Sequence, residues 1–226
     1  MQNDNYSKSL MNLLVRITGA NSIRLGSDTE LEVIELSFNI TTKIRLEPEV
    51  LPAWFTARQH DDSTDDGQDE HEKFTGKTHK EDFPLFYLLI DYIHHEGRIG
   101  DFARMGLLYI IEAAAHSVPL EQWIVESDLA TLMATGLGAL YSQLSRKLVI
   151  DFPFGELPPI LALSDYEHPI TTMEIVSSAS SDFQGHMATF LSHLSFWQDV
   201  LEHCVSVEIK QTLLEHFQVI FLQQLL

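Results

Sequence analysis

The chain has 226 residues, which is enough for one large domain or two small ones around a buried core. It carries 14 Lys and Arg residues against 33 Asp and Glu, and the formal net charge of -19 argues against nucleic acid or anionic lipid as a partner. The sequence has no apolar run of the roughly 20 residues that a transmembrane span needs, and its polar start does not resemble a signal peptide. The single cysteine, Cys204, excludes an internal disulfide and favours a cytoplasmic protein.

Residues 1–56 predict an N-terminal helical segment. Leu10 to Ile17 indicates a weak helix that a loop follows. Between Thr29 and Leu46 the apolar residues recur at helical spacing but also alternate as they would in a strand. The length of this stretch favours a helix, and Pro48 supplies its stop.

Residues 57–81 predict an acidic disordered linker. Seven acidic residues fall between Asp61 and Glu72 without a Lys or Arg among them, and apolar residues are few. Such a segment buries too little apolar surface to offset the entropy of ordering it. An acidic docking tail is the alternative, and a solvated loop is the better-supported interpretation.

Residues 82–226 predict a helical core. Asp82 begins a helix with Pro84 in its first turn, and Gly97 ends it. Asp101 is then placed to cap the next helix, which we expect to extend from Phe102 to about residue 116.

Ser127 and Asp128 are expected to cap a long helix through Leu144. A proline-rich connection follows at 149–171, and residues 172–181 give no clear pattern. Asp182 then starts the clearest helix, and Ser206 caps a last one. The buried stripe of the clearest helix is predicted to contain Phe183, Met187, Phe190, Leu194, Trp197, Leu201 and Cys204.

Successive amphipathic helices without strand signals predict an all-α fold. Short turns between them favour stacked antiparallel helix pairs, an α-solenoid of the armadillo or HEAT type, although no clean sequence repeat is present. The last residues, 223–226, carry neither cap nor polar tail. We therefore expect more chain or a partner to follow, and an exposed apolar patch that promotes self-association without it.

Eleven histidines make a metal site worth testing. His94 and His95 are adjacent, so on a helix they would point about 100° apart. His186 and His193 could share a helix face, but no His-Glu-x-x-His motif or further ligand completes a set. Surface or hydrogen-bonded histidines are therefore expected, with no metal and no cofactor.

Other candidate motifs also favour packing over chemistry. Gly136 and Gly138 do not form a dinucleotide fingerprint, because Tyr141 occupies the third glycine position and no strand precedes them. These glycines instead favour the close approach of two helices. Cys204 lies on an apolar stripe, which favours a packed thiol over a nucleophile.

Arg98, Asp101 and Arg104 form the one charged cluster that we single out. Helix capping with an ion pair is the preferred interpretation, and a protein-interaction site is the alternative. An acid–base pair is disfavoured because no nucleophile or cofactor motif accompanies it, so no catalytic residue is predicted.

Several longer sequence motifs carry a family resemblance. They are Leu46 to Phe55, Phe83-Pro84-Leu85, Gly97 to Arg104, Trp123 to Ala130, Gly136 to Leu144 and Phe196 to Glu202. In this order they resemble the FTS–Hook-interacting proteins, or retinoic-acid-induced-like proteins, most closely the fungal branch. The resemblance covers about residues 44–226, and because family members are much longer it implies an N-terminal portion.

The resemblance implies a cytoplasmic helical scaffold without catalytic residues, peripherally associated with early endosomes. The implied partners are a Hook adaptor, a catalytically dead ubiquitin-conjugating-like protein called FTS, and an endosomal Rab GTPase. Together they would connect endosomes to dynein. Two alternatives remain from the residues alone: a helical metal-dependent hydrolase, and a helical oligomerisation module without a trafficking role.

Overall fold

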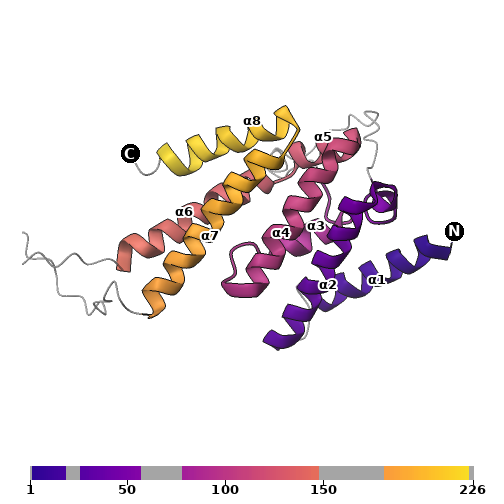
Figure 1. The fold of residues 1–226 in the computed structure, drawn as a ribbon, viewed down its shortest axis with the longest axis horizontal. Helices are drawn as coiled ribbons and strands as arrows, with labels where there is room; N and C mark the ends of the chain where they lie inside the picture. The colour runs from indigo at the N-terminus through magenta and orange to yellow at the C-terminus, as the bar shows by residue number, and fades with distance from the viewer. Residues whose placement is uncertain (1, 19–25, 57–77, 148–180, 224–226) are drawn as a thin grey trace, which may run out of the picture.

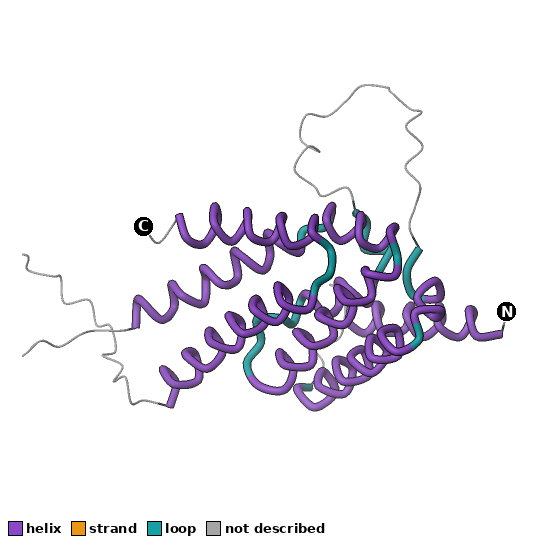
Figure 2. The backbone as a smooth tube through the Cα atoms, turned by 45° about the horizontal axis from the view of Figure 1, so that its top comes forward, coloured by secondary structure: helices purple, strands orange, loops and turns teal. Residues whose placement is uncertain are grey.

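The computed structural model describes residues 2–18, 26–56, 78–147 and 181–223, and within these ranges the chain contains helices and no strand (Figures 1 and 2). The all-α prediction is confirmed. The elements in chain order are α1 (Gln2–Thr18), α2 (Ser27–Leu46), η1 (Pro48–Ala53), α3 (Pro84–Ile90), α4 (Gly97–Ala113), η3 (Ala114–His116), α5 (Val118–Glu126), α6 (Leu129–Lys147), α7 (Ser181–His203), α8 (Val207–His216) and η4 (Phe217–Leu222).

The N-terminal segment packs directly on the helical core through α2 and α4, which lie side by side. The helical alternative for this stretch is confirmed, and Ile34 and Ile44 are fully buried on it. Two buried hydroxyls, Ser37 and Thr41, donate hydrogen bonds to carbonyls one turn earlier on α2. Their polar atoms are thus satisfied within the helix, so α4 can cover them without leaving an unpaired group.

Five aromatic side chains form a cluster where η1, α3 and α5 meet. Trp123 is its centre, with a ring centroid 4.9 Å from that of Phe86 in an edge-to-face arrangement. The rings of Phe55, Phe83 and Tyr87 each lie 5.8 Å from Trp123. Edge-to-face packing of this kind adds to the stabilisation from burial.

The C-terminal helices pack on one another, α6 against α7 and against η4. Two predicted caps are confirmed. Ser127 Oγ accepts from the backbone N of Leu129 at 3.4 Å, and Ser206 Oγ accepts from the backbone N of Ile209 at 3.1 Å. These serines satisfy N–H groups that a helix start leaves without an intrahelical partner.

The turn between α3 and α4 differs from the sequence prediction. The helix that begins at Pro84 ends at Ile90 and not at Gly97. Gly97 does adopt the left-handed conformation, with φ of +68°, but it stands at the start of α4. Asp101 is therefore the fifth residue of α4, and the prediction that it caps this helix is wrong. Glu96 occupies the N-cap position without a side-chain capping bond.

The hydrophobic core forms one cluster that includes Met11, Ile34, Leu107, Trp123 and Phe221. Residues on both sides of the predicted 57–81 linker thus share it, whereas 57–77 lie outside the described residues, as do 148–180 and Leu225. None of the helices that the structure describes has the length and hydropathy to cross a membrane.

Candidate functional site

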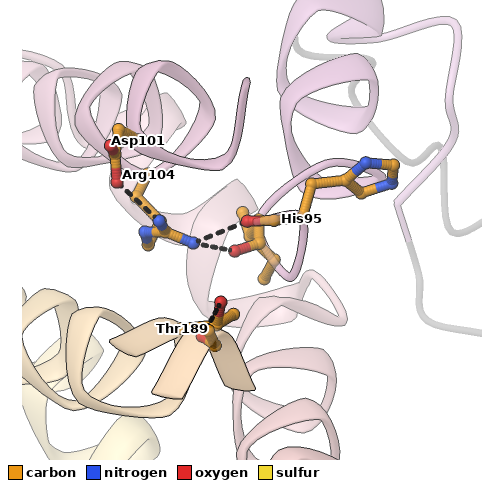
Figure 3. A network of polar contacts seen from close by, with 6 residues as sticks. His95, Asp101, Arg104 and Thr189 are labelled. Atoms are coloured by element: carbon orange, nitrogen blue, oxygen red, sulfur yellow. Dashed lines mark hydrogen bonds and ion pairs between the residues drawn. The ribbon is translucent and has the colours of Figure 1, made fainter. Parts of the chain in front are cut away.

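A buried guanidinium organises the junction of the α3–α4 turn with α4. Arg104 Nη1 donates to the backbone carbonyl of Ile93 at 2.6 Å and to that of His95 at 3.4 Å, and Nη2 donates to Asp101 Oδ1 at 2.7 Å. Figure 3 shows the guanidinium between these acceptors, with the His95 imidazole pointing away from it. Arg104 thereby satisfies carbonyls left exposed where the helical pattern of α3 breaks down, which explains why the chain turns before Gly97.

The predicted cluster is only partly assembled. Asp101 and Arg104 meet as an ion pair. Arg98 instead lies over the ring of Phe102, 5.5 Å from its centroid. Because the Arg104 side chain is 6% exposed, its charge contacts internal carbonyls and Asp101 and is not accessible to a partner.

Two histidines far apart in the sequence meet next to this junction. The rings of His94 and His193 lie 4.8 Å apart, and His193 Nε2 is 3.3 Å from the carbonyl oxygen of Met133. Buried His94 Nε2 and His193 Nδ1 have no hydrogen-bond partner among the described atoms. A Cβ added to Gly136 would overlap the His94 ring, so only glycine lets α6 approach this closely.

Burial keeps both imidazoles neutral. Desolvation, with the positive charge of Arg104 as a smaller cause, lowers the pKa of His94 to about 4. Desolvation also lowers the pKa of His193 to about 3, and the neighbouring His94 adds to the effect. Sequence reasoning missed this pair, because its signal is the close approach of Gly136 and not a local spacing.

His186, which the sequence spacing could place on one helix face with His193, makes a separate contact. His186 Nδ1 pairs with Glu96 Oε1 at 3.0 Å and so connects α7 to the start of α4. A group that the prediction did not include, Asp199, Glu202 and His203, brings its ligand atoms within 4.8 Å of one another on α7. The three side chains are exposed, and exposed acidic groups of this kind are common without a bound ion.

Cys204 is buried, as its apolar stripe predicted. Burial raises the pKa of the thiol, and Sγ donates to the carbonyl of Ser206 at 3.6 Å. A protonated, buried thiol is a poor nucleophile. The polar groups of this region thus hold helices together, and their geometry suits a structural junction better than a reaction centre.

Two surface hollows are candidates for protein contacts. One, of about 600 Å³, lies between α1, α2 and η1 and is lined by residues that include Tyr6 and Trp54. The other, of about 500 Å³, lies between α4 and α7 and includes Met105 and Leu191. Five further aliphatic residues are exposed just before α8 and along α8 and η4: Val205, Val207, Leu214, Val219 and Leu222.

Comparisons with known proteins identify related sequences. The chain is 43% identical over 67 residues to human "FHF complex subunit HOOK-interacting protein 1A", a match that covers 29% of this chain and 6% of that protein. It is 33% identical over 123 residues to an FHIP family protein of Brugia malayi, covering 54% of this chain and 11% of the relative.

Human "FHF complex subunit HOOK-interacting protein 1B" is 39% identical over 67 residues, 29% of this chain and 7% of that protein. The chain thus spans a small part of the length of the curated relatives that it matches. The profile of a family described as "Retinoic acid induced 16-like protein" matches residues 1–226. Because that match extends over the entire sequence, the chain belongs to the retinoic acid induced 16-like family.

Proposed function

We propose that this chain acts as a non-catalytic scaffold subunit that binds a Hook adaptor in a complex with an FTS-like protein. Through an endosomal Rab GTPase, this complex would connect early endosomes to dynein. The observation that carries the proposal is the family match over the whole chain, together with relatives whose names make them HOOK-interacting subunits of an FHF complex.

The arrangement of the described residues supports a scaffold more than an enzyme. Arg104 is engaged by carbonyls and a carboxylate, half-buried His94 and buried His193 are neutral, and the Cys204 thiol is buried. The apolar side chains left on the surface provide area for association with other proteins. We further propose that the helix pairs form the first layers of a solenoid and that the molecule works in the cytoplasm, on the outer face of endosomes.

A Hook pull-down tests the proposal. The purified 226-residue chain is immobilised and incubated with a purified Hook protein, with and without an FTS-like protein. We expect Hook retention that increases when the FTS-like protein is present. The control is Trp123→Ala, which removes the centre of the aromatic cluster. If Hook binding requires the folded helices, this substitution should abolish Hook retention.

Failure of the folded, unsubstituted chain to retain Hook would contradict the proposal. Metal analysis of the same sample then separates the scaffold from a metal-dependent hydrolase. A stoichiometric metal that survives dialysis would count against the scaffold.

A helical oligomerisation module is the second candidate, and one observation favours it. Val207 is 75% exposed and Leu214 50% exposed on α8, and Val219 and Leu222 are also exposed on η4. Light scattering across a concentration series distinguishes the two functions. Self-association that Leu214→Glu abolishes, without any Hook retention, would favour the module.

A further inference from the structure

The groove between α4 and α7 has two matching walls. Its α4 wall presents Asp101, Met105 and Leu108, at the i, i+4 and i+7 positions of one helix face. Its α7 wall presents Ala188, Ser192 and Ser195 at the same spacing. Leu191, Phe196, Asp199 and Arg104 complete the lining. The two helices pack against each other along this groove (Figure 1).

The groove combines apolar and polar side chains and is open to solvent. Met105 is 43% exposed and Leu191 52% exposed, although both are large side chains next to the buried Phe196. Three residues of the α7 wall, Ala188, Ser192 and Ser195, are small, so the backbone of a third helix could approach closely. From Ala188 to Asp199 the α7 wall is about 16 Å long, which matches about three helical turns.

Charge distinguishes this groove from a neutral apolar hollow. Its only lining cation, Arg104, is buried and bound to Asp101. Asp199 is exposed at the groove, and Glu202 and His203 lie close to it one turn further along α7. A ligand that fits here therefore needs apolar side chains for the floor and a positive charge for the Asp199 end.

We propose that the α4–α7 groove binds an amphipathic α-helix of another protein that carries Lys or Arg beside its apolar stripe. A helix offers apolar side chains at i, i+4 and i+7, the spacing that the two walls display. The 226 residues carry 14 Lys and Arg against 33 Asp and Glu, and this excess of negative charge favours a cationic partner. The proposal stands on the groove alone and does not depend on Hook binding.

Synthetic helices test the inference directly. The probe is a fluorescent peptide of about 20 residues with Leu at i, i+4 and i+7 and Lys on both flanks of that stripe. The matched peptide replaces each Lys with Glu, and a third peptide scrambles the Leu positions. Fluorescence anisotropy with the intact 226-residue chain should show saturable binding of the Lys peptide, about tenfold tighter than that of either matched peptide.

Substitutions in the groove then locate the binding site. Met105→Ser with Leu191→Ser should weaken the Lys peptide about tenfold or more, because both exposed anchors are truncated. Asp199→Lys should weaken the Lys peptide and strengthen the Glu peptide. The matched control is Leu132→Ser, which truncates a side chain that is 38% exposed on α6, outside the groove lining.

The exposed positions of these changes make loss of the fold a small risk, and circular dichroism of each variant checks it. Equal affinity for the Lys, Glu and scrambled peptides would overturn the proposal. So would binding that the groove variants leave unchanged, or that Leu132→Ser weakens as much as they do. Binding of the Lys peptide without Hook retention would support the groove proposal and contradict the proposed function. Hook retention without binding of the Lys peptide would contradict the groove proposal alone.

Discussion

Two junctions hold this molecule together by different means. Around Trp123, five aromatic rings pack edge to face. Around Arg104, the helices meet through a buried guanidinium, two neutral histidines and a glycine. The first junction depends on volume and apolar area, which do not change with pH. The second depends on hydrogen bonds and on the protonation of His94 and His193, so we expect it to weaken in acid and to tolerate few substitutions.

The largest effect should come from the aromatic junction. Trp123→Ala leaves a cavity among rings that cannot collapse into it, and we expect the free energy of unfolding to fall by about 3–5 kcal/mol. Urea unfolding followed by circular dichroism measures the change. A loss below about 1 kcal/mol would mean that this cluster is not the principal packing centre.

Arg104→Met tests the polar junction by replacing the guanidinium with an unbranched apolar side chain. The carbonyls of Ile93 and His95 lose their donor, and we expect a loss of about 2–4 kcal/mol. Hydrogen exchange should show opening of the α3–α4 turn before the aromatic junction. Arg104→Lys is the matched comparison, and it should recover part of the stability because the ammonium still donates. Equal stability of Met and Lys variants would show that the hydrogen bonds contribute nothing net.

Acid should separate the two junctions. The folded-state pKa values of His94 and His193, about 4 and about 3, lie below the unfolded value of 6.5. The unfolded chain therefore binds more protons between these values, so the contribution is fully present above pH 6.5 and is lost as the pH falls toward 4 and 3.

Each histidine should cost up to about 1.4 kcal/mol per pH unit in this window, or about 2 kcal/mol for both between pH 6.5 and 5.5. Urea unfolding at a series of pH values measures this slope. The control is His193→Gln, which should lower the slope by about 1.4 kcal/mol per pH unit. An unchanged slope would assign the acid sensitivity to other groups.

Gly136→Ala tests whether α6 needs a glycine against His94. The added methyl group displaces the half-buried His94 imidazole, and we expect a loss of about 1–3 kcal/mol. In a His94→Ala background the same change should cost clearly less, since the displaced ring is gone. Gly138→Ala, where an added Cβ meets nothing within 4 Å, is the control and should be neutral or slightly stabilising. Additive costs in the double variant would contradict the contact.

The smallest effect should come from Asp101→Ala. Its carboxylate is 59% exposed and does not cap α4, so we expect a loss of only about 0.5–1 kcal/mol through the ion pair with Arg104. Thermal unfolding at low and high salt measures it. A salt-independent loss above about 2 kcal/mol would show that Asp101 contributes more than an exposed ion pair.

Much of the secondary structure follows from local signals. Pro84, Ser127 and Ser206 mark helix starts because their effects on φ or on free N–H groups act within one turn. The helical choice for residues 27–46 follows from length and the stop at Pro48. The family resemblance is equally local, since it lies in contiguous words of the sequence.

The tertiary structure decided what those signals left open. Asp101 is a residue type that is common at the N-cap, yet α4 begins four residues earlier. The reason is that Arg104 binds the carbonyls of the preceding turn and Gly97 supplies the positive φ. Local pattern cannot reveal that bond, since it joins two elements across a turn.

The contact of His94 with His193 through the space beside Gly136 is even less accessible to sequence reasoning. It brings together the α3–α4 turn, α6 and α7, and no spacing in the chain encodes it. Local signals therefore predict most of the helices and the family to which the chain belongs, but not the end of α3 or the start of α4. Only the packing of those helices determined which polar groups are buried, and burial is what sets their charge and their hydrogen-bond partners.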